Sequence, residues 1–132
     1  MRRYQKRVGN ARGMTLIEIM IVLAIISMMM MGVSVMAIGM LEKAKVKNTK
    51  ITMKTIEQAL VHYQVDNSSD PCPRTLNDLF SQKYINKDPK DEWGSTFSFK
   101  CPGDHNSDGA DLISRGKDKQ EGTADDIKSW DQ

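Results

Sequence analysis

The chain has 132 residues, of which 39% are hydrophobic and 27% charged, with a formal net charge of +2 and two cysteines. This length bounds the protein to one small domain beside any membrane segment. The positive charge does not indicate nucleic-acid binding, because five of the 19 basic side chains lie in the first twelve residues and no basic stretch alternates with aromatic residues.

The first twelve residues form a basic stretch without an acid; its positive side chains are Arg2, Arg3, Lys6, Arg7 and Arg12. By the positive-inside rule this end stays in the cytoplasm, and we expect the rest of the chain to be sent outward. The 23 residues from Ile19 to Leu41 then carry no charged side chain. A helix of that length rises about 35 Å, enough to cross the roughly 30 Å of hydrocarbon in a bilayer.

Two other interpretations of this apolar run are a cleaved secretory signal and a plain signal anchor. The apolar region of a secretory signal is only about 7 to 15 residues long, so this run is too long for one. A plain signal anchor stays open. Glu18 lies at the near edge of the run, where a carboxylate costs about 3 kcal/mol and is normally kept for a function. It either meets a cation or lies at headgroup depth and snorkels.

Beyond Leu41 the pattern predicts that the helix continues to Val65. Residues that recur at intervals of seven define its apolar stripe, and lysines fall among them: Val46, Met53 and Leu60; Thr49, Ile56 and Tyr63; and Lys43, Lys45, Lys47, Lys50 and Lys54. This half of the helix is therefore amphipathic. We expect its charged face to be solvated, with the lysines nearest the span able to meet anionic headgroups.

The remaining domain, residues 66–132, is small enough to need a staple. Cys72 and Cys101 are the only cysteines and lie on the exported side, where an even count predicts a disulfide. Such a bond stabilises a fold by about 3 to 4 kcal/mol in the chain-entropy model. A catalytic thiol is the alternative, but neither His62 nor His105 lies in a nucleophile motif.

Inside this domain the spacing of apolar residues predicts a short helix at Leu76–Tyr84 and a half-buried strand at Thr96–Lys100. A further strand is expected at Ala110–Ser114. Before it, Asp104, Asn106 and Asp108 match the first half of an EF-hand loop. The twelfth position of that loop is Arg115 where a bidentate Glu is required, which favours a polar turn over a calcium site.

The segment between Cys101 and Gln132 holds eight acids and four bases, with glycines that permit tight turns. Hard oxygen ligands on such a loop suit calcium, which takes about six to eight oxygens in irregular geometry. A disordered acidic tail is the alternative. Against it stand Ile127 and Trp130, apolar residues that a solvated tail does not need.

Four groups of residues together resemble the type IV pilin-like family, and in particular the major pseudopilins of type II secretion systems. They are Gly13-Met14-Thr15-Leu16-Ile17-Glu18 before the apolar run; Tyr63-x-x-Asp66-Asn67; Tyr84-Ile85, Pro89 and Asp91-x-Trp93-Gly94; and Ser114-x-Gly116 with Asp118, Gly122-Thr123, Asp125-Asp126 and Ile127. The chain departs from the family in having Met14 for the usual Phe, Glu92 for the usual Pro, and no proline near Val35.

The resemblance implies that residues 1–13 are a leader, cut after Gly13 by a prepilin peptidase that N-methylates Met14. The cation for Glu18 would then be the ammonium group of Met14 on a neighbouring subunit. The resemblance also implies one structural calcium ion. Its ligands would be the side chains of Asp118, Asp125 and Asp126 and the backbone oxygens of Arg115 and Thr123.

The implied fold class is α+β, with the type IV pilin-like fold: a long N-terminal helix that carries a small head with a short antiparallel sheet and a calcium loop. Residues 14–41 would form the transmembrane and filament-core half of the helix. Residues 42–65 would be its amphipathic continuation, and residues 66–132 the periplasmic head with the disulfide.

The implied function is that of a structural subunit, not an enzyme, which polymerises into the periplasmic pseudopilus of a type II secretion system. Its implied partners are further copies of itself, minor pseudopilins, the prepilin peptidase, the inner membrane and its assembly platform, but no nucleic acid. One alternative is a type IV pilin of a surface fibre for adhesion, motility or DNA uptake. The alternative from another class is a membrane-anchored sensor or enzyme with an uncleaved signal anchor.

Overall fold

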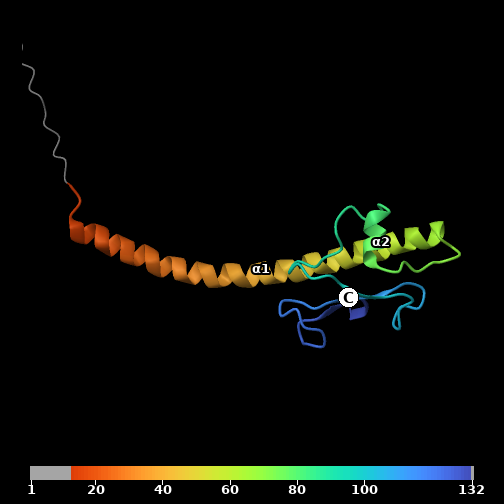
Figure 1. The fold of residues 1–132 in the computed structure, drawn as a ribbon. Coiled ribbons are helices and arrows are strands. Elements are labelled where there is room, and N and C mark those ends of the chain that lie inside the picture. Colours follow the sequence, from red (N-terminus) through yellow and green to blue (C-terminus); the bar gives the residue numbers. More distant parts are fainter. Residues whose placement is uncertain (1–12, 132) are drawn as a thin grey trace, which may run out of the picture. The chain divides into compact units, whose positions relative to one another are not determined.

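The computed structural model describes residues 13–131, so the basic stretch before Gly13 lies outside the described residues. The elements within that range are, in chain order, α1 (Leu16–Asp66), α2 (Leu76–Ser81), β1 (Ser98–Lys100), β2 (Asp111–Ser114), β3 (Ile127–Lys128) and the 3-10 helix η1 (Ser129–Asp131) (Figure 1). The chain divides into two compact units, with the boundary between Gly39 and Met40.

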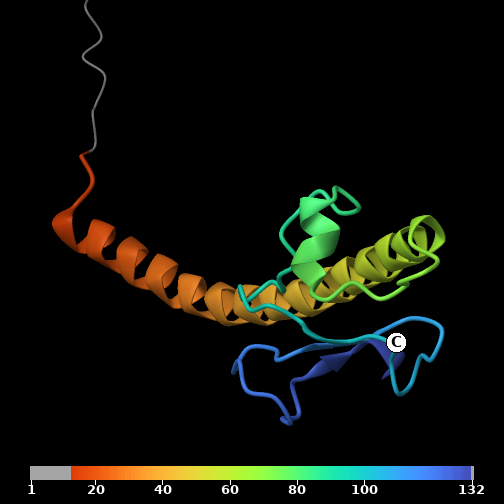
Figure 2. The same cartoon turned by 45° about the vertical axis from the view of Figure 1, so that its right-hand side comes forward.

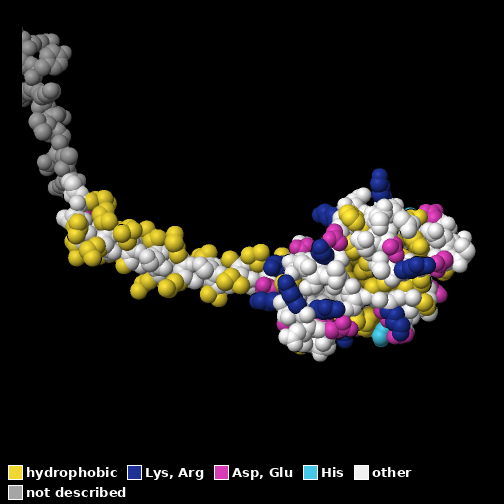
Figure 3. All heavy atoms as spheres, viewed as in Figure 1, with side chains coloured by type: hydrophobic (Ala, Val, Ile, Leu, Met, Phe, Trp, Pro, Cys, Tyr) yellow, Lys and Arg dark blue, Asp and Glu magenta, His cyan; other side chains and the backbone are white. Residues whose placement is uncertain are grey.

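The first unit is the apolar half of α1. Its side chains from Gly13 to Gly39 are all exposed, and most of them are hydrophobic (Figure 3). Within the described residues, α1 is the one helix with a stretch long and apolar enough to cross a membrane. The hydroxyls of Ser27 and Ser34 donate to backbone carbonyls one turn earlier, at 2.7 and 2.9 Å, so both of these hydroxyls are satisfied within the helix.

The second unit is built on one face of α1. The residues of α1 that it buries recur every three or four positions, as one face of a helix requires: Thr49, Met53, Ile56, Ala59, Leu60 and Tyr63. α2 lies on one side of this part of the helix and the sheet on the other (Figure 2). Residues from both sides complete the core, among them Leu76, Leu79, Phe97, Leu112 and Ile127. The helix ends at Asp66, one residue beyond the predicted end.

α2 is shorter than predicted, because it ends at Ser81 and not at Tyr84. The ring of Tyr84 packs edge-on against that of Tyr63, with 5.5 Å between their centroids. Its hydroxyl donates to the carboxylate of Asp66 at 2.8 Å. These two contacts draw the chain back onto α1 and stop the helix early.

The three strands form one antiparallel sheet in the order β1-β2-β3. β2 agrees with the strand predicted at Ala110–Ser114, except that it begins one residue later, at Asp111. β1 begins two residues later than predicted, because Thr96 pairs with Lys90 in an isolated bridge. β3, which pairs Ile127 with Ser114, was not predicted, since two residues are too few for an alternating pattern.

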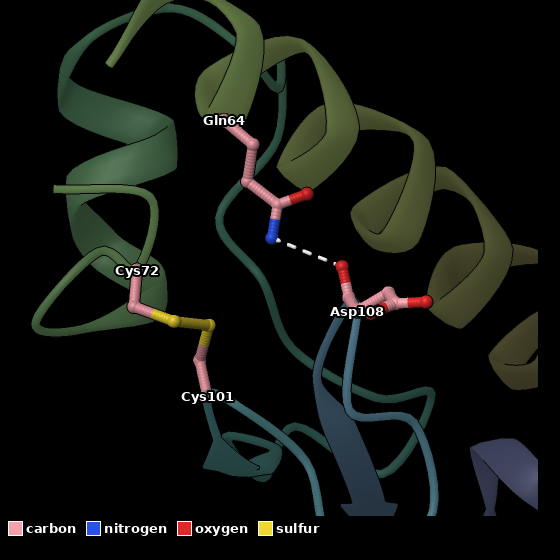
Figure 4. Close-up of a disulfide and its surroundings, with 4 residues drawn as sticks. All are labelled: Gln64, Cys72, Cys101 and Asp108. Carbon is pink, nitrogen blue, oxygen red and sulfur yellow. Dashed lines mark hydrogen bonds between the residues drawn. A yellow bond between two sulfur atoms is a disulfide. The ribbon is translucent and has the colours of Figure 1, made fainter. Parts of the chain in front are cut away.

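The predicted disulfide between Cys72 and Cys101 is present, with 5.6 Å between the two Cα atoms (Figure 4). It joins the segment after α1 to the residue after β1. Nearby, the side-chain amide of Gln64 donates to the backbone carbonyl of Asp108 at 3.3 Å. Both links hold the 101–110 loop against the end of α1.

Candidate functional site

The predicted processing site lies at the start of the described chain. Gly13 and Met14 are exposed and precede the first turn of α1. Apart from its chain neighbours, no heavy atom lies within 4 Å of the position that a Cβ on Gly13 would take. The peptide bond between the two residues is therefore accessible to an enzyme.

Glu18 forms a reciprocal capping box with Thr15 at the start of α1. Its carboxylate accepts from the backbone N–H and the hydroxyl of Thr15, at 3.3 and 3.4 Å, while the Thr15 hydroxyl oxygen accepts from the backbone N–H of Glu18 at 3.4 Å. This capping role was not predicted, although the Thr-x-x-Glu spacing is its signature. Glu18 thus has a partner in the isolated chain, and the neighbour's ammonium group predicted for it would be a second one.

The predicted calcium loop begins at the end of β2, and a buried polar chain fixes its first residues. The hydroxyl of Ser114 is fully buried, donates to the Asp91 carboxylate at 2.7 Å and accepts from the backbone N–H of Gly116 at 3.2 Å. Asp91 in turn accepts from the backbone N–H groups of Trp93 and Ser95, at 3.1 and 2.8 Å. The start of the loop is therefore held by hydrogen bonds from a separate part of the chain.

Gly116 has a φ of +61°, and a Cβ there would overlap with both the backbone oxygen and the carboxylate of Asp125. Only glycine adopts this backbone conformation easily and leaves that space free. The two ends of the loop can therefore approach each other at this point.

The three carboxylates predicted to bind calcium all accept hydrogen bonds from the loop itself. Asp125 accepts from the Thr123 hydroxyl at 2.7 Å and from the backbone N–H of Asp118 at 3.1 Å. The Thr123 bond, and after it the Asp118 bond, holds the pKa of the Asp125 carboxyl below its usual value. Asp126 accepts from the backbone N–H of Gly122 at 2.7 Å, and Asp118 from that of Gln120 at 2.8 Å.

This donor set fits a hard divalent cation in its chemistry, because it supplies carboxylate oxygens on a short loop tied together at Asp118 and Asp125. The side chains do not converge, however: within residues 13–131 no group of three or more His, Cys, Asp or Glu side chains is arranged to hold a metal ion. Of the two residues predicted to contribute backbone oxygens, the Thr123 oxygen accepts from the backbone N–H of Asp126 at 3.3 Å. The side chain of Arg115 lies 3.7 Å from Glu121.

The 115–126 loop also contacts α1 within the second unit. The ammonium group of Lys117 lies 3.6 Å from the carboxylate of Glu42. Lys117 is well exposed, so this ion pair contributes little stability. The contact nevertheless places the loop beside Glu42, the first charged residue after the apolar run.

The stretch that resembles half of an EF-hand is arranged around an anion instead of a cation. Its backbone N–H groups at Asp104, His105 and Asn106 all donate to the carboxylate of Asp111, at 2.8, 3.0 and 3.1 Å. The carboxylate of Asp104 is bound to Lys100 at 2.6 Å. The stretch is thus the polar turn that the sequence favoured. Its backbone N–H groups bind Asp111, a residue for which no such role was predicted.

Asp111 is only 6% exposed. Burial by itself would raise its pKa, but the hydrogen bonds from His105, Asn106 and Asp104 outweigh burial and lower the pKa below its usual value. The His105 ring, which also bonds Asp111 at 3.0 Å, stacks on Trp130 with 3.9 Å between centroids. Asp111 therefore links the turn to the C-terminal 3-10 helix.

Two family models match the chain. The model described as "Type II secretion system (T2SS), protein G" covers residues 36–130, and the one described as "Prokaryotic N-terminal methylation motif" covers residues 9–34. Similar proteins include the type II secretion system core protein G of Escherichia coli strain K12, which is 32% identical over 90% of both chains. The core protein G of Vibrio cholerae is 30% identical over 95% of both, and that of Pseudomonas aeruginosa is 32% identical over 90% of this chain and 94% of its own. No solved structure matches significantly.

We expect Asp111→Asn to lower the free energy of unfolding of the second unit by about 2 kcal/mol at neutral pH, because it removes a charge that backbone N–H groups bind. A lowered folded pKa means that this contribution is complete above the unfolded value of about 3.9 and is lost as the pH falls through the folded value. Urea unfolding in a chelator should therefore show the difference between wild type and variant shrinking from about pH 5 to pH 3.

The control is Asp131→Asn, an exposed acid for which we expect no such difference. A difference between wild type and Asp111→Asn that stays constant down to the lowest pH would contradict the assignment.

Proposed function

We propose a function from one premise: the chain belongs to the family of type II secretion system (T2SS) protein G. It is a major pseudopilin, a structural subunit that polymerises into the pseudopilus of a secretion system. The observation that carries this function is the match to protein G over residues 36–130, together with relatives aligned over nine-tenths of both chains.

The rival functions are less well supported. A surface fibre shares the leader and the long helix, but the match to protein G includes the C-terminal loop, where the resemblance to secretion pseudopilins is most specific. A membrane-anchored sensor or enzyme requires an uncleaved anchor. The methylation motif over residues 9–34 argues against that.

A prepilin peptidase cuts the chain between Gly13 and Met14 and methylates the new N-terminus. The methylation motif and the accessibility of Gly13 support this step. Cleavage removes five basic residues, which leaves 14 basic against 17 acidic side chains and turns the net charge to −3. The mature subunit is thus acidic.

Before assembly the subunit is anchored in the inner membrane by the apolar residues 19–41 of α1, with its N-terminus in the cytoplasm and its second unit in the periplasm. The exposed hydrophobic surface of this half of α1 supports that location. Further copies, minor pseudopilins and the inner-membrane assembly platform are its partners.

Glu18 guides assembly by binding the ammonium group of Met14 on a neighbouring subunit. Both charges lie in an apolar environment, where opposite charges attract more strongly than in water and where an unpaired charge is costly. The bonds that the Glu18 carboxylate accepts from Thr15 are long, at 3.3 and 3.4 Å, and their donors are uncharged, so a positively charged donor outcompetes them.

One calcium ion stabilises the 115–126 loop of the second unit. The residues that would hold it are the side chains of Asp118, Asp125 and Asp126 and the backbone oxygens of Arg115 and Thr123. Support comes from the carboxylate oxygens that the loop supplies. It also comes from the hydrogen bond that the backbone N–H of Asp118 donates to the Asp125 carboxylate.

The first prediction of the proposed function concerns processing. Intact-mass analysis of protein from cells with an active prepilin peptidase should show a chain that begins at N-methyl-Met14, because the Gly13–Met14 bond is accessible and lies in the methylation motif. Protein from cells without the peptidase is the control and should keep its leader. A full-length chain in both strains would show that the chain is not cleaved after Gly13 and would contradict the proposed processing.

The second prediction separates the two roles of Glu18. Glu18→Gln keeps a capping-box acceptor but removes the charge, whereas Glu18→Val removes both. If binding the neighbour's ammonium group is the function, both variants should insert in the membrane and neither should form filaments in cells. Normal filaments with Glu18→Gln but not Glu18→Val would leave helix capping as the sole role.

The third prediction concerns calcium. The second unit, residues 40–132 with its disulfide formed, should melt at a lower temperature in a calcium chelator and recover with calcium but less with magnesium, which resists irregular sites. A ligand that binds only the folded form adds about 2.7 kcal/mol at a hundredfold excess over its Kd. Asp125→Ala should abolish the response, and Asp131→Ala should keep it. An unchanged melting temperature in the chelator would show that the loop does not bind calcium.

A further inference from the structure

The polar half of α1 carries a row of four lysines on one face. Lys43, Lys47, Lys50 and Lys54 follow one another at intervals of four, three and four residues, so they lie on one side of the helix. All are exposed except Lys50, which is half-buried. The core face from Thr49 to Tyr63 lies on another side of α1 and leaves this row uncovered. We call these four residues the basic stripe.

In the part of the chain that the structure describes, the stripe is neutralised only at Lys54, whose charge acts on the carboxylate of Glu57 one turn along α1. Within residues 13–131 none of its four ammonium groups forms an ion pair, and the neighbouring acid, Glu42, is paired with Lys117. Like charges at these spacings destabilise a helix by roughly 0.2 to 0.5 kcal/mol per pair. The isolated subunit therefore holds a self-repelling face that a negatively charged partner would stabilise.

The opposite charge lies at the other end of the polar half of α1. Residues 67–132 hold 13 acids against 9 bases. Three exposed acids surround the end of the helix: Asp66, Asp70 and Asp108. The Asp66 carboxylate accepts from the Tyr84 hydroxyl, and Asp108 is held there by its backbone carbonyl (Figure 4). Within residues 13–131 the Asp108 carboxylate forms no ion pair. We call these three residues the acidic end.

Lys54, at the far end of the stripe, lines a hollow together with Asp108 of the same subunit. The earlier lysines of the stripe cannot reach the end of α1 within one subunit. From Lys47 to Asp66 the helix rises about 28 Å, much more than the reach of two side chains. A surface that is complementary to a different surface of the same molecule makes a head-to-tail contact, and such contacts build open filaments when the rotation does not close a ring.

An anionic membrane is the other partner that a basic surface fits, and the arrangement of the lysines favours a protein. A helix leaving a bilayer meets headgroups all around and only within roughly 5 to 8 Å of the hydrocarbon edge. The stripe instead keeps to one face and extends about 16 Å along the axis from Lys43. This shape fits an elongated neighbour that lies alongside the helix.

We propose that the basic stripe of one subunit docks on the acidic end of the next subunit along the filament. The proposal rests on the proposed function, since it names the contact by which copies of this chain add to one another. The lysines then replace mutual repulsion by ion pairs with the neighbour, and the same contact repeats at each added subunit.

The test uses the full-length chain, expressed in cells with an active secretion system, and two pairs of charge reversals. Lys47→Glu with Lys50→Glu should lose filaments, and Asp70→Lys with Asp108→Lys should lose them as well. All four changes in one chain restore opposite charges across the contact and should restore filaments. The matched control for the lysine pair is Lys45→Glu with Lys87→Glu. It lowers the net charge by the same amount at residues outside the stripe and should assemble normally. Formation of the Cys72–Cys101 disulfide checks that each variant is folded.

A second readout is cross-linking between subunits. Lys47→Cys and Asp70→Cys in one chain should give an oxidation ladder of dimers, trimers and longer products, because two cysteines must come within about 7 Å of each other between Cα atoms. Lys87→Cys with Asp70→Cys should give none.

The outcomes separate the contact from the function. If the wild-type chain forms no filaments, the proposed function fails and the contact with it. If wild type and the Lys47→Glu, Lys50→Glu variant assemble equally, the contact alone is wrong. If the four-residue swap stays defective while the lysine variant no longer binds vesicles of anionic phospholipid, the stripe binds membrane and the contact is wrong too.

Discussion

Burial of one face of α1 between Thr49 and Tyr63 is the interaction on which the second unit depends. Its strands have only three, four and two residues, and α2 has six. Elements this short cannot bury enough apolar surface against one another to be stable. Each packs instead on a helix that already exists, so the amphipathic half of α1 acts as the largest part of the core.

Buried acids fix the loops that such a small core cannot hold. Asp91 and Asp111 are each 6% exposed, and each accepts hydrogen bonds from backbone N–H groups of a neighbouring turn. A buried carboxylate is costly unless its lone pairs are filled, and bonds to a charged acceptor are about twice as strong as neutral ones. In each of the two turns, therefore, one acidic side chain fixes the conformation of the backbone.

The sequence was sufficient for the features that depend on local pattern or on counting. The apolar run, the amphipathic continuation to Val65, one residue short of its observed end, and the pairing of two exported cysteines all belong to this class. Features that depend on distant partners were missed or misjudged. α2 stops early because Tyr84 contacts Tyr63, and β3 exists only because β2 lies beside it. Asp111 was taken as an ordinary strand residue, since nothing local shows that a turn seven residues earlier closes on it. The capping box of Thr15 and Glu18 was a local signal, overlooked because the carboxylate was considered only as an assembly residue.

Gly116 has a consequence for the comparison of related chains. Any side chain at this position would meet the carboxylate and the backbone oxygen of Asp125 and would also disfavour the φ of +61°. A relative that keeps every acid of the loop but replaces this glycine would have to move Asp125 away from Asp118. The glycine, which carries no functional group, is therefore a more stringent marker of an intact loop than the presence of the acids.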